Sequence, residues 1–323
     1  MYSELLVVSK QTGVPVKKVL DVFWYLSRGE DIENNELVQR VGVSRNVLNQ
    51  IKKSLSAYLT PSSKMTSLRA NAIEKVGSLY SSNYLTEEDL LTTLTKGEVY
   101  DQSVKLLSGL KDRSPVPNRS YDQFTATVET TARRAVLLDF LGDLRDKRVL
   151  FLGDDDMTSV AIASLKSTQD VTVLDIDERI LGNIEDISGE YNFGIRKIMH
   201  DLRNPIPAEL RGKFDTVFTD PPYSPEGIKL FISRAIEALD KKNQAARIYL
   251  CYGNSDRAKE RFLPVQNALT ESGLMVRWVI DKFNRYEGAE SIGSSSTLYV
   301  TEITPQTKPL IRGNYDKPIY TID

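Results

Sequence analysis

Two acidic stretches, each directly after an apolar run, hold the residues best suited to chemistry. The first is Gly153-Asp154-Asp155-Asp156 and the second is Asp220-Pro221-Pro222-Tyr223. Apolar runs bounded by turn residues predict buried strands, and open α/β sheets bind ligands at the carboxyl ends of their strands. Three carboxylates stand where a nucleotide-binding fold usually has glycines. The sequence therefore predicts a Rossmann-like site for a cationic ligand.

The three aspartates Asp154, Asp155 and Asp156 exceed what the capping of a helix needs. A carboxylate at a helix N-terminus contributes about 0.3–1 kcal/mol, so one of them could be only a cap. Repulsion among three adjacent carboxylates is unfavourable unless a cation occupies the site. Mg²⁺, a polyamine or a sulfonium would each satisfy this requirement, and the residues alone leave the choice open.

Two further acidic turns follow the next predicted strands. One holds Asp175, Ile176 and Asp177, and the other holds Asp201 and Leu202. An acidic residue in the first of these turns is positioned for ribose hydroxyls, although Asp177 would equally suit a helix cap. A carboxylate at Asp201 could accept a hydrogen bond from an adenine amino group. Both turns are consistent with a bound nucleoside.

The loop Asp220-Pro221-Pro222-Tyr223 is the most specific local signal, typical of enzymes that act on a nitrogen nucleophile. The prolines fix φ and remove two amide donors, which stiffens the turn. Asp220 can then accept N–H bonds from an incoming amine, and the ring of Tyr223 can lie against a cation or a planar base. Glu226, three residues later, adds a carboxylate.

Other residues that could contact an amine lie nearer the C-terminus. Tyr249 and Tyr252 belong to a predicted strand and its end, and Tyr286 and Glu287 lie in a loop between the last two predicted strands. The loop 284–290 could cover the site, or it could be a solvated hairpin loop. The sequence alone favours neither interpretation.

The elements that must position these residues alternate between strands and helices, which predicts a doubly wound α/β sheet. An antiparallel pair is expected at the end, at 274–281 and 296–302. The expected parallel strands are Arg148–Leu152, Val171–Asp175, Phe214–Thr219 and Ala246–Cys251, and the expected helices are Thr158–Leu165, one from Glu178, and Gly227–Leu239.

The region before this sheet is predicted to be helical. Residues 36–51 match a helix-turn-helix, with Ser44 as the cap of its second helix, and 59–76 could supply the wing of a winged helix. We expect a helical or winged-helix-like domain at 1–112 and a linker with a helix at 113–147. A Rossmann-like catalytic domain at 148–304 and a mobile tail at 305–323 follow.

Composition restricts the class of protein. With 323 residues and 41% hydrophobic content the chain can form two domains, and no run is long enough to predict a membrane span. One cysteine, Cys251, and one histidine, His200, argue against disulfides and against zinc, and predict a cytoplasmic protein. Residues 1–80 hold 11 basic and 7 acidic residues, whereas the whole chain has a net charge of −2. Nucleic acid is therefore an unlikely partner of the acidic site, although the N-terminal region permits such a contact.

On these motifs the chain resembles the branched-chain polyamine synthases, or N4-bis(aminopropyl)spermidine synthases. The resemblance rests on the stretches 153–156, 175–179, 220–227 and 285–288 and on the winged-helix-like N-terminal region. It implies a class I methyltransferase-like fold. It also implies transfer of aminopropyl groups from decarboxylated S-adenosylmethionine to the secondary amine of spermidine, with methylthioadenosine as by-product. Separately, we expect a homodimer that forms through the N-terminal domain.

The resemblance implies binding and catalytic roles for Asp154, Asp155 and Asp156. Together with the motifs described above it gives three overlapping sets of expected site residues, and the expected chemistry requires no metal. The catalytic set is Asp154, Asp155, Asp156, Asp220 and Tyr223. The donor-binding set is Gly153, Asp154, Asp175, Ile176, Asp177, Asp201, Leu202 and Asp220. The acceptor-binding set is Asp156, Tyr223, Glu226, Tyr252, Tyr286 and Glu287.

Electrostatics agree with a decarboxylated donor. S-adenosylmethionine itself brings a carboxylate towards the loop after the first strand, and one like-charge contact at 4 Å costs about 4 kcal/mol at an effective dielectric constant near 20. Decarboxylation leaves only a propylammonium group, which the aspartates attract. The acceptor amine must lose a proton before it attacks, and a nearby carboxylate can take that proton.

Two other functions stay open at this stage. The Asp220 loop would suit an S-adenosylmethionine-dependent amino-methyltransferase that acts on nucleic acid, although the acidic first loop argues against it. The helix-turn-helix would suit a DNA-binding regulator that senses a polyamine, with Arg45, Asn46, Lys52 and Lys53 near the recognition helix.

Overall fold

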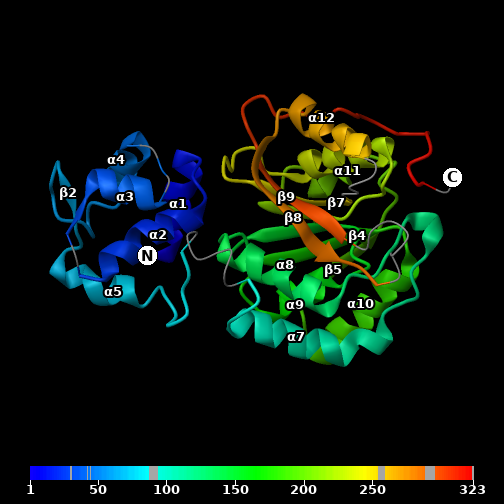
Figure 1. Cartoon of the computed structure of the whole chain (residues 1–323), viewed down its shortest axis with the longest axis horizontal. Coiled ribbons are helices and arrows are strands. Elements are labelled where there is room, and N and C mark those ends of the chain that lie inside the picture. The colour runs from blue at the N-terminus through cyan, green and yellow to red at the C-terminus, as the bar shows by residue number, and fades with distance from the viewer. Residues whose placement is uncertain are drawn as a thin grey trace. The chain divides into compact units, whose positions relative to one another are not determined.

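The computed structural model describes residues 1–29, 31–41, 43, 45–86, 94–253, 259–287 and 295–321. The chain divides into two compact units (Figure 1). The first unit comprises residues 1–97, 137–142 and 242–245, and the second comprises 98–136, 143–241 and 246–323. The first division along the chain thus falls between Gly97 and Glu98.

The second unit is built on a seven-stranded sheet with the order β5-β4-β3-β6-β7-β9-β8. Five strands run parallel, and β9 pairs antiparallel with both β7 and β8. The strands are β3 Arg148–Leu152, β4 Asp170–Asp175, β5 Ile195–Met199, β6 Thr216–Thr219, β7 Arg247–Gly253, β8 Met275–Arg285 and β9 Ser295–Glu302. The predicted doubly wound α/β fold with a final antiparallel pair is confirmed.

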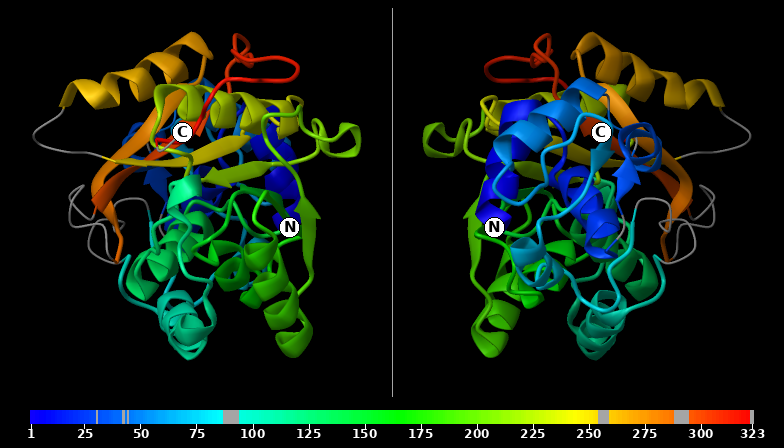
Figure 2. Two further views of the ribbon diagram at one scale, coloured as in Figure 1. Left: turned by 90° about the vertical axis from the view of Figure 1, so that its right-hand side faces the viewer. Right: turned by 90° about the vertical axis from the view of Figure 1, so that its left-hand side faces the viewer.

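Helices cover both faces of this sheet. Helices α9 and α10 lie on one side and α11 and α12 on the other (Figures 1 and 2). The helices of this unit of eight residues or more are α7 Glu98–Leu110, α8 Val128–Phe140, α10 Glu178–Tyr191, α11 Pro225–Ala238 and α12 Leu263–Glu271, and α9 is the shorter Thr158–Ser164. Because both faces are covered, the central strands are buried throughout, and β3 and β6 are continuous apolar or β-branched runs rather than alternating ones.

Two side-chain caps begin helices directly after the strands that lead to the acidic loops. Asp177 caps α10 by accepting the N–H of Arg179, and Ser224 caps α11 by accepting the N–H of Gly227 at 2.9 Å. These short connections hold the turns after β4 and β6 against the carboxyl edge of the sheet.

The C-terminal segment packs against the second unit, contrary to the expected mobile tail. Ile319 is 1% exposed and belongs to the core that Leu150, Val217 and Leu250 share. The backbone N–H of Tyr315 donates to the carbonyl of Arg203 at 2.8 Å. Apolar side chains in this segment make burial more favourable than solvation, a pattern that its prolines and charges concealed.

The first unit is a small helical bundle with a separate core and a two-stranded sheet. Its described helices are α1 Tyr2–Thr12, α2 Val16–Ser27, α3 Asn34–Val41, α4 Arg45–Ser54 and α5 Ile73–Gly77, and its strands are β1 Ile32–Glu33 and β2 Met65–Thr66. Strand β2 and helix α5 lie in the expected wing segment, and the winged-helix classification stays a prediction. The expected cap Ser44 falls outside the described residues. None of the described helices could cross a membrane.

Candidate active site

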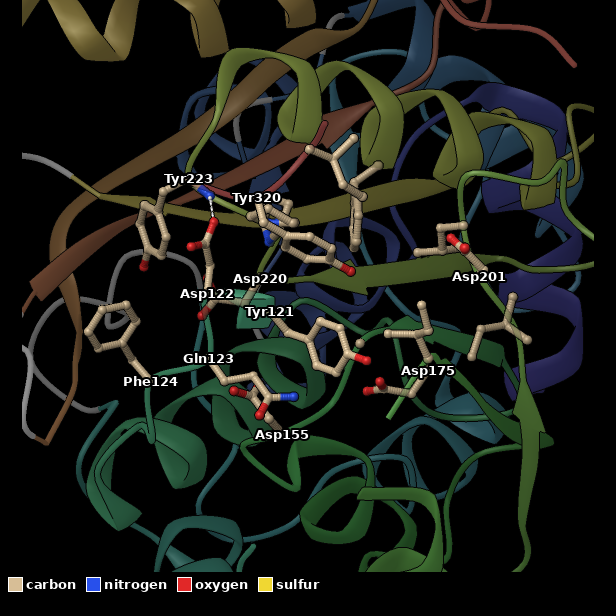
Figure 3. Close-up of a pocket in the computed structure, with 18 of the residues that line it drawn as sticks. Tyr121, Asp122, Gln123, Phe124, Asp155, Asp175, Asp201, Asp220, Tyr223 and Tyr320 are labelled. Carbon is tan, nitrogen blue, oxygen red and sulfur yellow. Dashed lines mark hydrogen bonds between the residues drawn. The ribbon is translucent and has the colours of Figure 1, made fainter. Parts of the chain in front are cut away.

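The acidic turns meet around one cavity at the carboxyl edge of the sheet (Figure 3). Five carboxylates line it: Asp122, and one residue after each of four strands, namely Asp155 after β3, Asp175 after β4, Asp201 after β5 and Asp220 after β6. Parallel strands bring these residues together although they are far apart in the sequence. Gly153, Ile176 and Leu202, also expected in the donor site, line the same cavity.

The three adjacent aspartates have three different environments. Asp154 accepts the N–H of Thr158 at 2.8 Å and that of Ser159 at 3.1 Å, so it satisfies the start of α9. Asp156 forms an ion pair with Arg134 at 2.7 Å. Asp155 is half-buried and faces the cavity. The aspartates are therefore not equivalent, and Asp155 is the one that can meet a ligand in this cavity.

Burial and like charges disfavour the ionised form of the carboxylates at this edge. Burial, and then the charges of Asp156, Asp220 and Asp175, raise the pKa of Asp155 well above its ordinary value. Burial also raises the pKa of Asp220 to about 6, although the charge of Arg134 opposes this change. Burial raises the pKa of Asp175 to about 6 as well. A cationic ligand would relieve this electrostatic cost.

Arg134 of α8 is the main site residue that the sequence analysis missed. It is 1% exposed, and its guanidinium contacts both acidic motifs, through Asp156 and, at 3.0 Å, through Asp220. Leu137 and Leu138, three and four residues later, are fully buried. Arg134 therefore occupies a position that helical periodicity assigns to the core-facing side of α8. A charged residue at such a position is the sequence signal that could have revealed Arg134 as a site residue.

The donor-side turns differ in their access to the cavity. Asp175 accepts the N–H of Asp154 at 3.1 Å and that of Asp177 at 2.8 Å, and it still lines the cavity. Asp177 caps α10 and pairs with Arg179 at 2.6 Å, and it is absent from the cavity lining. Asp201 lines the cavity while the neighbouring Arg203 pairs with it. The contacts of Asp177 thus fit the role of a helix cap better than that of a ribose-binding residue.

Two tyrosines that were not expected in the site also line the cavity. Tyr121 lies before α8 and Tyr320 in the C-terminal segment, and their ring centroids are 5.5 Å apart. Asp122, beside Tyr121, accepts the N–H of Tyr223 at 3.2 Å and that of Thr321 at 3.0 Å (Figure 3). One carboxylate therefore ties the Asp220 loop to the C-terminal segment. Such a long-range contact leaves no local sequence signal.

The residues expected to bind the acceptor separate into two groups. Tyr223 and Tyr286 line the cavity, and the hydroxyl of Tyr286 donates to Asp220 at 2.5 Å. Tyr252 is 3% exposed, donates to the carbonyl of Tyr223 at 2.9 Å and supports the loop from behind.

Two more candidates lie outside the cavity lining. Tyr249 donates its hydroxyl to the buried Asp143, and Glu226 at the start of α11 contacts Tyr315 of the C-terminal segment. Of the loop 284–290, residues 288–290 fall outside the described residues.

A second cavity shares Asp155 with the first. Its lining also includes Asp156, Met157 and Glu287, and Glu287 pairs with Lys111 of α7 at 2.8 Å. Asp155 thus lies where two cavities meet, with acidic groups on both sides. This arrangement can hold two cationic ligands around one carboxylate.

Over the described part of the chain, no group of three or more His, Cys, Asp or Glu side chains is placed to hold a metal ion.

The strand order defines a class I methyltransferase-like fold. A crystal structure of the branched-chain polyamine synthase from Thermus thermophilus, in complex with N4-aminopropylspermidine and 5'-methylthioadenosine, has this fold. It matches with a TM-score of 0.62 and 23% identity, over 99% of this chain and 98% of that one.

The chain belongs to the branched-chain polyamine synthase family, since residues 102–320 match the model of the branched-chain polyamine synthase A C-terminal domain. It is 42% identical to the uncharacterized protein MJ0675 of Methanocaldococcus jannaschii over 65% of this chain and 51% of the relative. It is 37% identical to an N(4)-bis(aminopropyl)spermidine synthase of Thermococcus kodakarensis over 54% of this chain and 50% of the relative. The chain thus spans about half the length of the curated relatives it matches.

Proposed function

We propose that this chain transfers aminopropyl groups from decarboxylated S-adenosylmethionine to the secondary amine (N4) of spermidine. The products would be N4-aminopropylspermidine, N4-bis(aminopropyl)spermidine and methylthioadenosine. The observation that carries the proposal is Asp155, a carboxylate of raised pKa where two acidic cavities meet. Relatives named for this synthesis support it.

The first cavity would take the donor. Asp175 would accept hydrogen bonds from the ribose, and Asp201 together with Leu202 would contact the adenine. The rings of Tyr121 and Tyr320 offer flat apolar surface for the base. The propylammonium arm would extend towards the excess negative charge between Asp155 and Asp220.

The acceptor amine would lie beside Asp155, on the side of the second cavity. Spermidine is protonated near neutral pH, so its secondary amine must release a proton before it has a lone pair, and the raised pKa of Asp155 suits it to take that proton. The nitrogen lone pair then forms a bond to the propyl carbon that is attached to sulfur. The carbon–sulfur bond breaks, and its electron pair stays on sulfur, which turns the sulfonium into the neutral thioether of methylthioadenosine.

The second transfer differs from the first in one respect. The tertiary amine of N4-aminopropylspermidine, once deprotonated, attacks a second donor and becomes a quaternary ammonium that has no proton to lose. Stabilising this permanent charge needs carboxylates close to the nitrogen, and Asp155, Asp156 and Glu287 supply three around the second cavity. Orientation of the two reactants would contribute much of the rate.

One incubation tests the function. Purified protein is mixed with spermidine and either S-adenosylmethionine or its decarboxylated form, and the products are identified by mass spectrometry. We expect aminopropyl additions with the decarboxylated donor only. Methyl transfer to DNA or RNA would instead establish the amino-methyltransferase, and binding of spermidine without turnover would favour the polyamine-sensing regulator.

A homodimer and a cytoplasmic location belong to the same proposal. The single cysteine supports a reducing compartment. Light scattering of the full chain would detect a dimer, and a monomer at all concentrations would exclude one.

A further inference from the structure

Arg134 uses every N–H of its guanidinium inside the protein. Its five acceptors come from four segments of the chain: the loop after β3, the start of α9, the loop after β6 and the region of Asn284 and Tyr286. Nε donates to Asn284 at 2.9 Å, Nη1 to Asp156 at 2.7 Å and Thr158 at 3.3 Å, and Nη2 to Asp220 at 3.0 Å and Tyr286 at 3.4 Å. A guanidinium with five donors in a rigid fork fixes all of these groups at once.

This saturation excludes one common use of an active-site arginine. A buried arginine can bind a ligand carboxylate, but Arg134 has no N–H left and is only 1% exposed. Its charge instead compensates Asp156 and Asp220. Asp155, the neighbour of Asp156 in sequence, faces the cavities and receives no ion pair among the described residues.

We propose that Arg134 is a positioning residue: it holds Asp156 and Asp220 as fixed anions and thereby leaves Asp155 as the carboxylate that exchanges a proton with the acceptor amine. This inference rests on the proposed function for the identity of the amine. Its electrostatic part, the control of the ionisation of Asp155 by Arg134, does not depend on turnover.

Several charged and titratable groups set the ionisation of Asp155. The groups that face it or its immediate partners are Asp156, Asp175, Asp220, Arg134, Tyr223, Tyr286 and Cys251, with Glu287 and Lys111 across the second cavity. Arg134 is the cation in this set that contacts the acidic motifs directly. Removing it should therefore make ionisation of Asp155 harder, whereas removing the negative charge of Asp156 should make it easier.

The test measures the ionisation of Asp155 directly. Protein labelled with ¹³C at the aspartate carboxyl carbons is titrated by NMR, and Asp155→Asn identifies the signal. We expect the Asp155 carboxyl to titrate at higher pH in Arg134→Met than in wild type, and at lower pH in Asp156→Asn. Arg134→Lys keeps the charge and should show a smaller change than Arg134→Met.

Steady-state kinetics provide the functional readout. In Arg134→Met we expect kcat at neutral pH to fall about 10- to 1,000-fold, with a loss that shrinks as pH rises, because the ionised fraction of the proton acceptor recovers. The KM for the donor should change less than kcat. A merely structural role would lower the rate equally at every pH.

Arg247 supplies the matched control. It is fully buried and pairs with two carboxylates, Asp143 and Glu302, away from the cavities. Arg247→Lys should lower the melting temperature as Arg134→Lys does, without moving the Asp155 titration or the pH profile.

Two results would overturn the proposal. One is an Asp155 signal that titrates at the same pH in wild type and in a folded Arg134 variant. The other is an Asp155 carboxyl that titrates at the same pH in Asp156→Asn as in wild type. This second result decides the question if no Arg134 variant folds. If wild type transfers no aminopropyl group, the proposed function fails, but the titration still tests the role of Arg134.

Discussion

The second unit contains two buried arginine networks that look alike and differ in charge balance. Arg134 and Arg247 are each almost completely buried and each pair with two carboxylates. The Arg247 network gains a second cation, since Arg277 pairs with Glu302 at 2.6 Å. The Arg134 network instead lies beside a third carboxyl group, Asp155, which forms no ion pair among the described residues.

The consequences are opposite for the carboxylates involved. Although burial alone would raise the pKa of Glu302, the hydrogen bond from Arg277 and the charge of Arg247 lower it. Beside Arg134, burial and like charges raise the pKa of both Asp155 and Asp220. A buried network in which cations and carboxylates are matched in number stabilises the fold. A network with excess carboxylates beside a cavity has an unfavourable electrostatic free energy, which a cationic ligand can relieve.

The largest expected effect is on kcat, which should depend on the carboxyl group beside Arg134 and not on those that pair with Arg247. Asp155→Asn should lower kcat about 10²- to 10⁴-fold, because the carboxylate that takes the proton is lost. Glu302→Gln should leave kcat unchanged at temperatures where it is folded. Product formation followed by mass spectrometry gives the rates, and circular dichroism checks folding. Turnover near the wild-type rate in Asp155→Asn would remove this residue from the mechanism.

The next effect separates the networks by stability. Arg247→Met should lower the free energy of unfolding by about 3–5 kcal/mol, because the buried Asp143 would lose its cationic partner and Glu302 would keep only Arg277. Urea unfolding measures the change. The kcat of the folded fraction should not change. A loss of activity without a loss of stability would show that the Arg247 network contributes to the reaction and would contradict the difference drawn between the two networks.

A smaller effect concerns pH. The raised pKa of Asp155 means that the folded state favours the protonated carboxyl, so this group's contribution to stability is present at low pH and is lost as pH rises through the raised value. Asp155→Asn should therefore raise the melting temperature at alkaline pH, by about 2–4 °C for about 1 kcal/mol. The two proteins should melt more nearly alike in acid, and a difference that grows on acidification would contradict the sign.

The smallest effect is expected at the ion pair of Lys111 and Glu287, whose side chains are 56% and 47% exposed. Lys111→Met should change the free energy of unfolding by less than about 1 kcal/mol, because water screens exposed pairs. Since Glu287 would be freed to meet an acceptor ammonium group, the KM for spermidine should fall modestly. Glu287→Gln is the matched variant and should raise the KM for spermidine. Equal KM values in the two variants would show that the acceptor does not bind near Glu287.

Much of the fold could be predicted from local patterns. The strand at Arg148–Leu152 and the helices beginning at Thr158 and Glu178 occur where apolar runs and capping residues indicate. The C-terminal segment could not be predicted in this way. Its order comes from Ile319 in a distant core and from Thr321 bound to Asp122, contacts for which neighbouring residues provide no signal.

The candidate site was predictable in composition but not in arrangement. The sequence by itself determined that carboxylates would gather at one sheet edge, because each follows a strand and parallel strands end together. Only the tertiary structure decided what each carboxylate does: Asp154 satisfies α9, Asp156 pairs with Arg134 and Asp155 faces the cavities. The physical reason is that ionisation depends on burial and on charges brought close by folding, and the charge of Arg134 comes from a helix outside both motifs.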